Sequence, residues 1–122
     1  MPTTTINIDA SGKMTAKMIE NISFQDSNSS ITAQTYVLEL YAAYAYTINT
    51  LKIISTSGTC TAAVKINGTS VTGISAVSVS STIATGTGTA ANTVAVGDKI
   101  TLVITSPSSL TDLQASIKTT RI

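Results

Sequence analysis

From Thr47 to the C-terminus, apolar residues alternate with small or polar ones in short runs that turn-forming residues separate. The runs Cys60–Ile66 and Lys99–Thr105 show this pattern most clearly. A period of two is typical of β-strands with one buried face, because successive side chains of a strand point to opposite sides. We therefore expect one core shared by the inward residues of these strands: Cys60, Val64, Ile66, Ile100, Leu102, Ile104, Leu113 and Ile117.

Pairs of turn-forming residues predict where the chain reverses. Ser57-Gly58 is expected to turn a strand at 47–55 into a strand at 59–66. Asn67-Gly68 has the composition of a two-residue hairpin turn with positive φ angles, after which residues 69–74 return antiparallel.

Two further hairpins are predicted in the C-terminal half. Residues 76–81 are expected to pair with residues 83–90, and residues 99–105 with residues 113–119 around the loop 106–112. Short strands at intervals of roughly 8 to 12 residues are typical of sandwiches, jelly rolls and small barrels. The predicted fold is all-β: an antiparallel β-sandwich or jelly-roll-like domain of about seven to nine strands.

The N-terminal third is harder to interpret. Residues 13–24 fit both a helix and a strand, and the strand is the preferred interpretation. The polar residues 25–30 predict a loop. The four tyrosines of the chain follow between residues 36 and 46, where core packing is the default reading and a helix at 36–43 stays open.

The first twelve residues form a candidate arm ahead of a single β-domain at 13–122. A short extended segment of this kind is rarely stable alone, so it can add as a strand to a neighbouring chain. The alternative is that it pairs within its own domain. The candidate attachment residues are Thr3, Thr4, Thr5, Ile6 and Ile8.

Composition narrows the fold class and the partners. Thr and Ser occupy 39 of 122 positions, whereas only 13 residues are charged, and Thr favours pleated, half-exposed surfaces. The seven basic residues are scattered singly, so we expect no nucleic-acid partner. No apolar run approaches the roughly 20 residues of a membrane span, and the N-terminus lacks the regions of a signal peptide, so no membrane association is expected.

Few residues offer chemistry. The chain has no histidine, which excludes Ser-His and Cys-His nucleophiles, and Cys60 falls on an inward face. Serine is so abundant that no Ser-Lys pair stands out. The six carboxylates are dispersed in the sequence, so we expect no metal site, no cofactor and no enzymatic activity.

Several segments in order resemble a small β-domain found in virion proteins of tailed bacteriophages, at the ends of tail fibres and in short capsid-associated proteins. The matching segments are 45–51 (AYTINTL), 57–59 (SGT), 63–73 (AVKINGTSVTG), 89–98 (TAANTVAVGD) and 113–121. Residues 1–44 lie outside the resemblance. The resemblance implies a homo-oligomer, often a trimer, bound to a capsid or tail.

These observations lead to one favoured function and two alternatives. The favoured one is a non-enzymatic phage structural protein, made in the host cytoplasm, that decorates or cements the capsid exterior as a homo-oligomer on the major capsid protein. The short chain favours this over a fibre, which needs a long shaft. The alternatives are a tail-fibre or receptor-binding tip that contacts host glycans, and a free carbohydrate-binding module, for which the tryptophan platform is missing.

Overall fold

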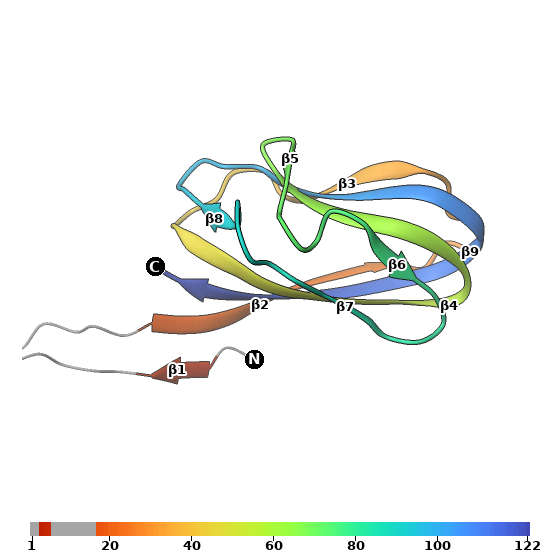
Figure 1. Ribbon diagram of the computed structural model, residues 1–122, viewed down its shortest axis with the longest axis horizontal. Helices are drawn as coiled ribbons and strands as arrows, with labels where there is room; N and C mark the ends of the chain where they lie inside the picture. Colours follow the sequence, from red (N-terminus) through yellow and green to blue (C-terminus); the bar gives the residue numbers. More distant parts are fainter. Residues whose placement is uncertain (1–2, 6–16) are drawn as a thin grey trace, which may run out of the picture.

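The computed structural model describes residues 3–5 and 17–122, with side chains from residue 18 onward. These residues form nine β-strands and no helix, which confirms the all-β prediction (Figure 1). The absence of helix from this part of the chain also means that it holds no helical membrane span. The strands are β1 (Thr3–Thr5), β2 (Lys17–Asp26), β3 (Gln34–Glu39), β4 (Tyr46–Ile66), β5 (Thr69–Ser70), β6 (Val77–Val79), β7 (Ala84–Thr87), β8 (Thr93–Val94) and β9 (Ile100–Arg121).

Two long strands carry the fold. β4 and β9 pair antiparallel from Tyr46 opposite Arg121 to Ile66 opposite Ile100, and both bend midway so that the sheet folds over on itself. One layer has the strand order β1-β2-β9-β4, and β7 and β8 pair with the other edge of β4. The second layer has the order β3-β9-β4, and β5 and β6 pair with the other edge of β4. Figure 1 shows the two layers and the bends that join them at one end.

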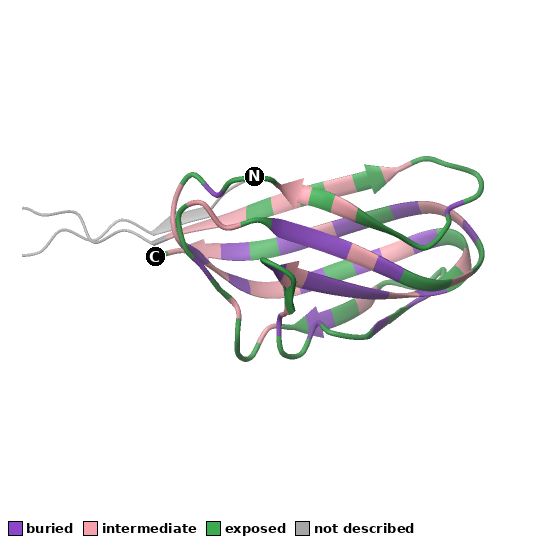
Figure 2. Ribbon diagram, turned by 90° about the horizontal axis from the view of Figure 1, so that it is seen from above, coloured by how far each residue is buried: buried purple, intermediate pink, exposed green. Residues whose placement is uncertain are grey.

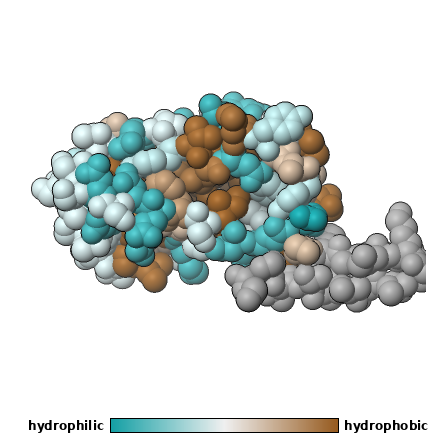
Figure 3. Space-filling view, turned by 180° about the vertical axis from the view of Figure 1, so that it is seen from behind, coloured by the Kyte–Doolittle hydropathy of each residue, from teal (hydrophilic) through white to brown (hydrophobic). Residues whose placement is uncertain are grey.

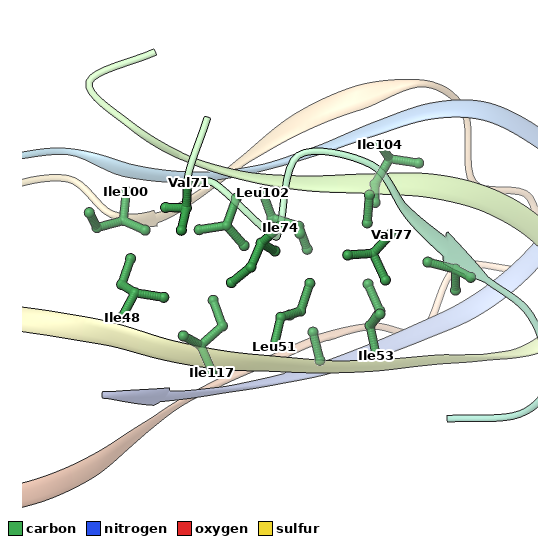
Figure 4. Close-up of a cluster of buried hydrophobic side chains, with 14 of the residues drawn as sticks. Ile48, Leu51, Ile53, Val71, Ile74, Val77, Ile100, Leu102, Ile104 and Ile117 are labelled. Carbon is green, nitrogen blue, oxygen red and sulfur yellow. The ribbon is translucent and has the colours of Figure 1, made fainter. Parts of the chain in front are cut away.

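The core fills the space between the layers. In Figure 4, Ile48, Leu51, Ile53 and Ile117 of one layer point toward Leu102 and Ile104 of the other. All eight residues predicted to share the core belong to one buried cluster. Lys118 is exposed, as the predicted register requires. Burial of these apolar side chains is the main stabilising contribution to the fold.

The prediction of hairpin turns at 57–58 and 106–112 is wrong. Each segment lies inside a continuous strand and bends it from one layer to the other. Gly58 has φ +80°, and a Cβ atom there would lie 2.1 Å from the carbonyl oxygen of Ser109 on the facing strand. Ser106 and Ser109 also have positive φ angles, 50° and 49°. Residues 99–105 and 113–119 therefore do not pair with each other; both pair with β4.

The predicted pairing of residues 76–81 with residues 83–90 is also wrong. Residues 76–81 and 83–90 contain β6 and β7, but each of these strands pairs with β4 instead of with the other. A register shift between Ile48 and Thr50 turns the side chain of Ile48 to the core together with those of Leu51 and Ile53.

Other local predictions are confirmed. Asn67 and Gly68 have φ angles of 49° and 85°, as a two-residue hairpin turn requires, although the returning strand is only Thr69–Ser70. Residues 17–24 lie in β2, and residues 13–16 lie outside the described chain. The segment at 36–43 is not helical, because β3 covers Gln34–Glu39.

Candidate functional site

The groups with chemical reactivity are dispersed or buried. Cys60 is a free, buried cysteine, and burial raises the pKa of its thiol, which disfavours the reactive thiolate. In residues 3–5 and 17–122, no group of three Cys, Asp or Glu side chains is close enough to hold a metal ion.

One end of the sandwich carries exposed apolar side chains on two loops and at the C-terminus, and we call this surface the apolar end. It consists of Leu40, Tyr41, Val96 and Ile122, with exposed fractions of 72%, 69%, 58% and 67%. In Figure 1 it lies where β4 begins and β9 ends. Exposed apolar clusters of this kind are typical of interaction sites.

Backbone hydrogen bonds hold the two loops of the apolar end together. The amide of Ala42 donates to the carbonyl of Asp98 at 2.9 Å, and the amide of Gly97 donates to the carbonyl of Ala42 at 2.8 Å. The ring of Tyr41 lies over Gly97, since a Cβ atom there would be 3.3 Å from the ring. The loops are therefore fixed before any partner binds.

The Asp98 carboxylate holds one of these loops, at residues 95–98, and joins it to the turn at Asn67. It accepts hydrogen bonds from the amide of Ala95 at 2.9 Å and from the side chain of Asn67 at 2.8 Å. These bonds, the Ala95 amide first, lower the pKa of Asp98, because they stabilise its charged form. The side chain of Asn67 accepts in turn from the amide of Lys99 at 2.9 Å.

A polar cluster next to the apolar end joins β2 to the C-terminus. Arg121 makes a salt bridge with Glu20 at 3.1 Å and lies over the ring of Tyr44, 3.6 Å from its centre. The hydroxyl of Tyr44 donates to Glu20, and this bond is the main cause of the raised pKa of Tyr44. The ring of Tyr46 packs against that of Tyr44, with 5.7 Å between ring centres. The cluster ties Glu20, just beyond the part of β2 that pairs with β1, to the body of the domain.

The candidate attachment residues are only partly placed. Thr3, Thr4 and Thr5 form β1, which pairs with Ile19, Met18 and Lys17 of β2 in the same chain. Ile6 and Ile8 lie outside the described residues. The three threonines thus pair with β2 of their own chain, and the attachment role of all five residues stays a prediction.

A second surface, which we call the β2–β3 side, is formed by β2 in one layer and β3 in the other. Each of these strands has an edge that is unpaired over most of its length in the described structure. In β3, and in β2 from Met18 onward, no side chain is fully buried, so Figure 2 shows these strands without the buried bands of the central pair. Phe24 and Tyr36 contact each other across the layers at 4.5 Å, and the Tyr36 hydroxyl donates to Asp26 at 2.5 Å. Burial, followed by this bond, raises the pKa of Tyr36.

Apolar side chains are partly open on the β2–β3 side. Ile22 and Leu38 are half-buried like Phe24 and Tyr36, and Val37 is 50% exposed. Seen from behind in Figure 3, hydrophobic atoms gather in the middle of the molecule between hydrophilic ones. This side is therefore less completely covered than the core.

A groove lies on the outer face of the layer that contains β2. It has a volume of about 510 Å³ and is open to solvent. Its lining includes amide, hydroxyl and apolar side chains, among them Gln25, Gln114, Ser116, Ile54 and Ile83. None of the four tyrosines lines it, so the groove offers no tyrosine platform for a sugar ring.

Comparison of the chain with protein-family models, curated proteins and solved structures finds no match. Leu40, Val96 and Ile122 were not singled out from the sequence. Of these three residues only Val96 adjoins a turn-forming residue, Gly97, and no local pattern distinguishes Leu40 or Ile122.

Proposed function

We propose that this protein is a non-enzymatic structural protein of a phage virion, a decoration or cement protein that binds the capsid exterior as a homo-oligomer. The observation that carries the proposal is the apolar end, where Leu40, Tyr41, Val96 and Ile122 are exposed on two hydrogen-bonded loops and at the C-terminus. The sequence resemblance to phage virion domains supports the choice of partner, the major capsid protein.

The apolar end suits a protein partner for two reasons. Interfaces bury aromatic and apolar side chains at their centres, and an exposed Tyr41 beside Leu40 offers both. The supporting loops are held by hydrogen bonds from Ala42, Gly97 and Asp98, so little conformational entropy is lost on binding.

Binding to purified capsids that lack the protein tests the proposal. Tyr41→Asp should weaken binding about tenfold or more, since truncating an aromatic anchor at an interface costs at least ~1.4 kcal/mol. Ile83→Asp is the matched control, because Ile83 is 59% exposed but lies in the loop between β6 and β7. Equal binding by both variants and the parent chain would place attachment elsewhere.

Deleting residues 1–12 tests the arm separately. β1 pairs with only three residues of β2, so the deleted chain should keep its β-sheet circular dichroism spectrum. Its binding to capsids should fall. Unfolding of this variant would make the segment a core strand, whereas unchanged binding would exclude it from attachment.

The open groove favours a second candidate function, a tail-fibre or receptor-binding tip that contacts host glycans. Amide side chains such as Gln25 and Gln114 beside an apolar Ile54 suit hydroxyl-rich ligands. In a glycan-array measurement, Gln114→Ala should then abolish binding while Tyr41→Asp leaves it unchanged. No binding to any glycan removes this candidate.

A further inference from the structure

The outer edge of β2 is only partly paired. β1 covers Lys17, Met18 and Ile19, and among the described residues no strand pairs with the remaining edge from Glu20 to Asp26. An exposed edge presents backbone amides and carbonyls that can pair with another strand. The stretch Asn21–Gln25 carries no charged side chain, no proline and no bulge, which are the usual features that prevent such pairing.

The hydrogen bonds of β4 determine which backbone groups of β2 point toward β9 and which point toward the open edge. Ile48 and Ser55, whose side chains point inward, donate their amides to Asn92 and Ser80, away from β9. In an antiparallel sheet, the backbone amide and carbonyl of one residue point to the strand on one side, and those of the next residue point to the strand on the other side. Residues of β4 whose side chains point out of the sandwich therefore form backbone hydrogen bonds with the outward-pointing residues of β9. Inward residues of β9 then bond to inward residues of β2.

The edge-facing groups of β2 can now be named. Ile22 and Phe24 pair with the inward Ile117 and Ala115 of β9, so their backbone groups are used inside the sheet. The amides and carbonyls of Asn21, Ser23 and Gln25 therefore face the open edge.

We propose that two copies of this chain join through their β2 edges, antiparallel and two-fold symmetric, with Ser23 opposite Ser23 of the second copy. Asn21 then lies opposite Gln25 of the second copy, and every edge-facing amide and carbonyl of Asn21, Ser23 and Gln25 gains a partner. The side chains agree with this register, because amide faces amide on the outer face and the half-buried Ile22 faces Phe24 on the inner face.

The length of the open edge fits the same register. Residue 27 of the second copy would lie opposite Ile19, where Thr3 already pairs. β2 ends at Asp26, where the Asp26 carboxylate accepts from the amide of Asn28 at 3.1 Å and starts a turn. Each chain thus leaves the shared sheet where the other chain's β1 begins.

One contact opposes the pairing. Glu20 lies opposite Asp26 of the second copy, and like charges in this position are destabilising. Each carboxylate has a partner within its own chain, however: Arg121 is 3.1 Å from Glu20, and the Tyr36 hydroxyl binds Asp26. The repulsion is reduced accordingly.

Sedimentation analysis of the full chain over a dilution series tests the inference, which specifies the homo-oligomer of the proposed function. We expect a dimer, and a monomer or a trimer overturns the inference. Ser23→Lys should raise the dissociation constant about fivefold or more, because the two lysines face each other across the axis. Mixing it with Ser23→Glu should restore dimers, which a general loss of structure would not allow.

Oxidative cross-linking tests the register. Directly opposed residues in an antiparallel pair lie about 5.5 Å apart between Cα atoms, within disulfide range. Ser23→Cys should form a covalent dimer, whereas Ser78→Cys, exposed on β6, should not. Absence of the Ser23→Cys dimer overturns the register. Capsid binding by Ser23→Lys at the parent level would show that the proposed function stands without this dimer.

Discussion

The central β4–β9 pair and the β2–β3 side differ in how completely they are covered. Along β4 and β9 the inward side chains are buried, and both strands have neighbours on each side over most of their length. Along β3 and from Met18 in β2 no residue is fully buried, and each strand has an edge that is open over most of its length in the described structure.

This difference separates stability from association. Fully buried aliphatic side chains in the central pair contribute the larger share of hydrophobic stabilisation. Half-buried rings and open edges on the β2–β3 side contribute less, but they retain surface and backbone groups that a second chain can cover. Substitutions in the two regions should therefore have different consequences.

The largest contrast is expected for the same substitution on neighbouring strands. Leu102→Ala on β9 removes a side chain with no exposed area and should lower the free energy of unfolding by about 2–5 kcal/mol. Leu38→Ala on β3 removes a half-buried one and should cost about 1 kcal/mol. Urea denaturation followed by circular dichroism measures both. Equal losses would remove the distinction between the regions.

The bend that joins the layers offers a second contrast, between two glycines with positive φ. Gly58→Ala should cost about 3 kcal/mol or more, since it adds a clash with the Ser109 carbonyl to the backbone strain. At Gly68 no atom lies within 4 Å of the added Cβ atom, so only the strain of about 1 kcal/mol is expected. Similar losses for both would mean that the bend tolerates movement.

The sequence predicted local conformation better than strand partners. Alternation identified the inward residues of β4 and β9, and Asn67-Gly68 identified its hairpin turn, because both signals depend on neighbouring residues alone. Ser57-Gly58 was misread because a glycine with positive φ can either close a hairpin or bend a strand. The facing Ser109, distant in sequence, decides between them.

The candidate surfaces were harder to predict. The loops that carry Leu40 and Val96 meet only because Ala42 and Asp98 join them, and nothing in the local sequence indicates this contact. The open edge of β2 depends on which strands leave it unpaired, which only the complete topology shows. The sequence indicated that the tyrosine-rich segment packs against the core. It did not indicate that Tyr41 is exposed whereas Tyr46 is buried.

Two tyrosines sharpen the comparison at high pH. Tyr46 belongs to the buried core, and its hydroxyl has no hydrogen-bond partner among the described residues. Burial, followed by the charge of nearby Glu39, raises the pKa of Tyr46 above its ordinary value of 10.0. As pH rises above 10, the unfolded tyrosine therefore loses its proton first. Stability falls by up to about 1 kcal/mol per pH unit after allowance for solvent screening.

Tyr46→Phe should remove this part of the alkaline loss at little cost at pH 7, since no hydrogen bond is broken. Tyr36→Phe on the β2–β3 side should cost about 1 kcal/mol at pH 7, because it breaks the bond to Asp26. Urea midpoints at pH 7 and above pH 10 measure both effects. A large loss for Tyr46→Phe at pH 7 would reveal a partner for its hydroxyl.

The smallest effect is expected for the loops of the apolar end, because local polar contacts stabilise them independently of the core. The Asp98 pKa lies below its ordinary value of 3.8, so as pH falls the unfolded chain binds this proton first and the contribution of Asp98 to stability is lost below about pH 4. Asp98→Asn should reduce the loss of unfolding free energy below about pH 4. It should also speed hydrogen exchange at the Ala95 amide, which donates to this carboxylate, while exchange in the central strands at pH 7 stays unchanged. Slower exchange at Ala95 and throughout β4 and β9 would contradict this prediction. Faster exchange throughout β4 and β9 would show that the apolar end unfolds in the same cooperative unit as the core.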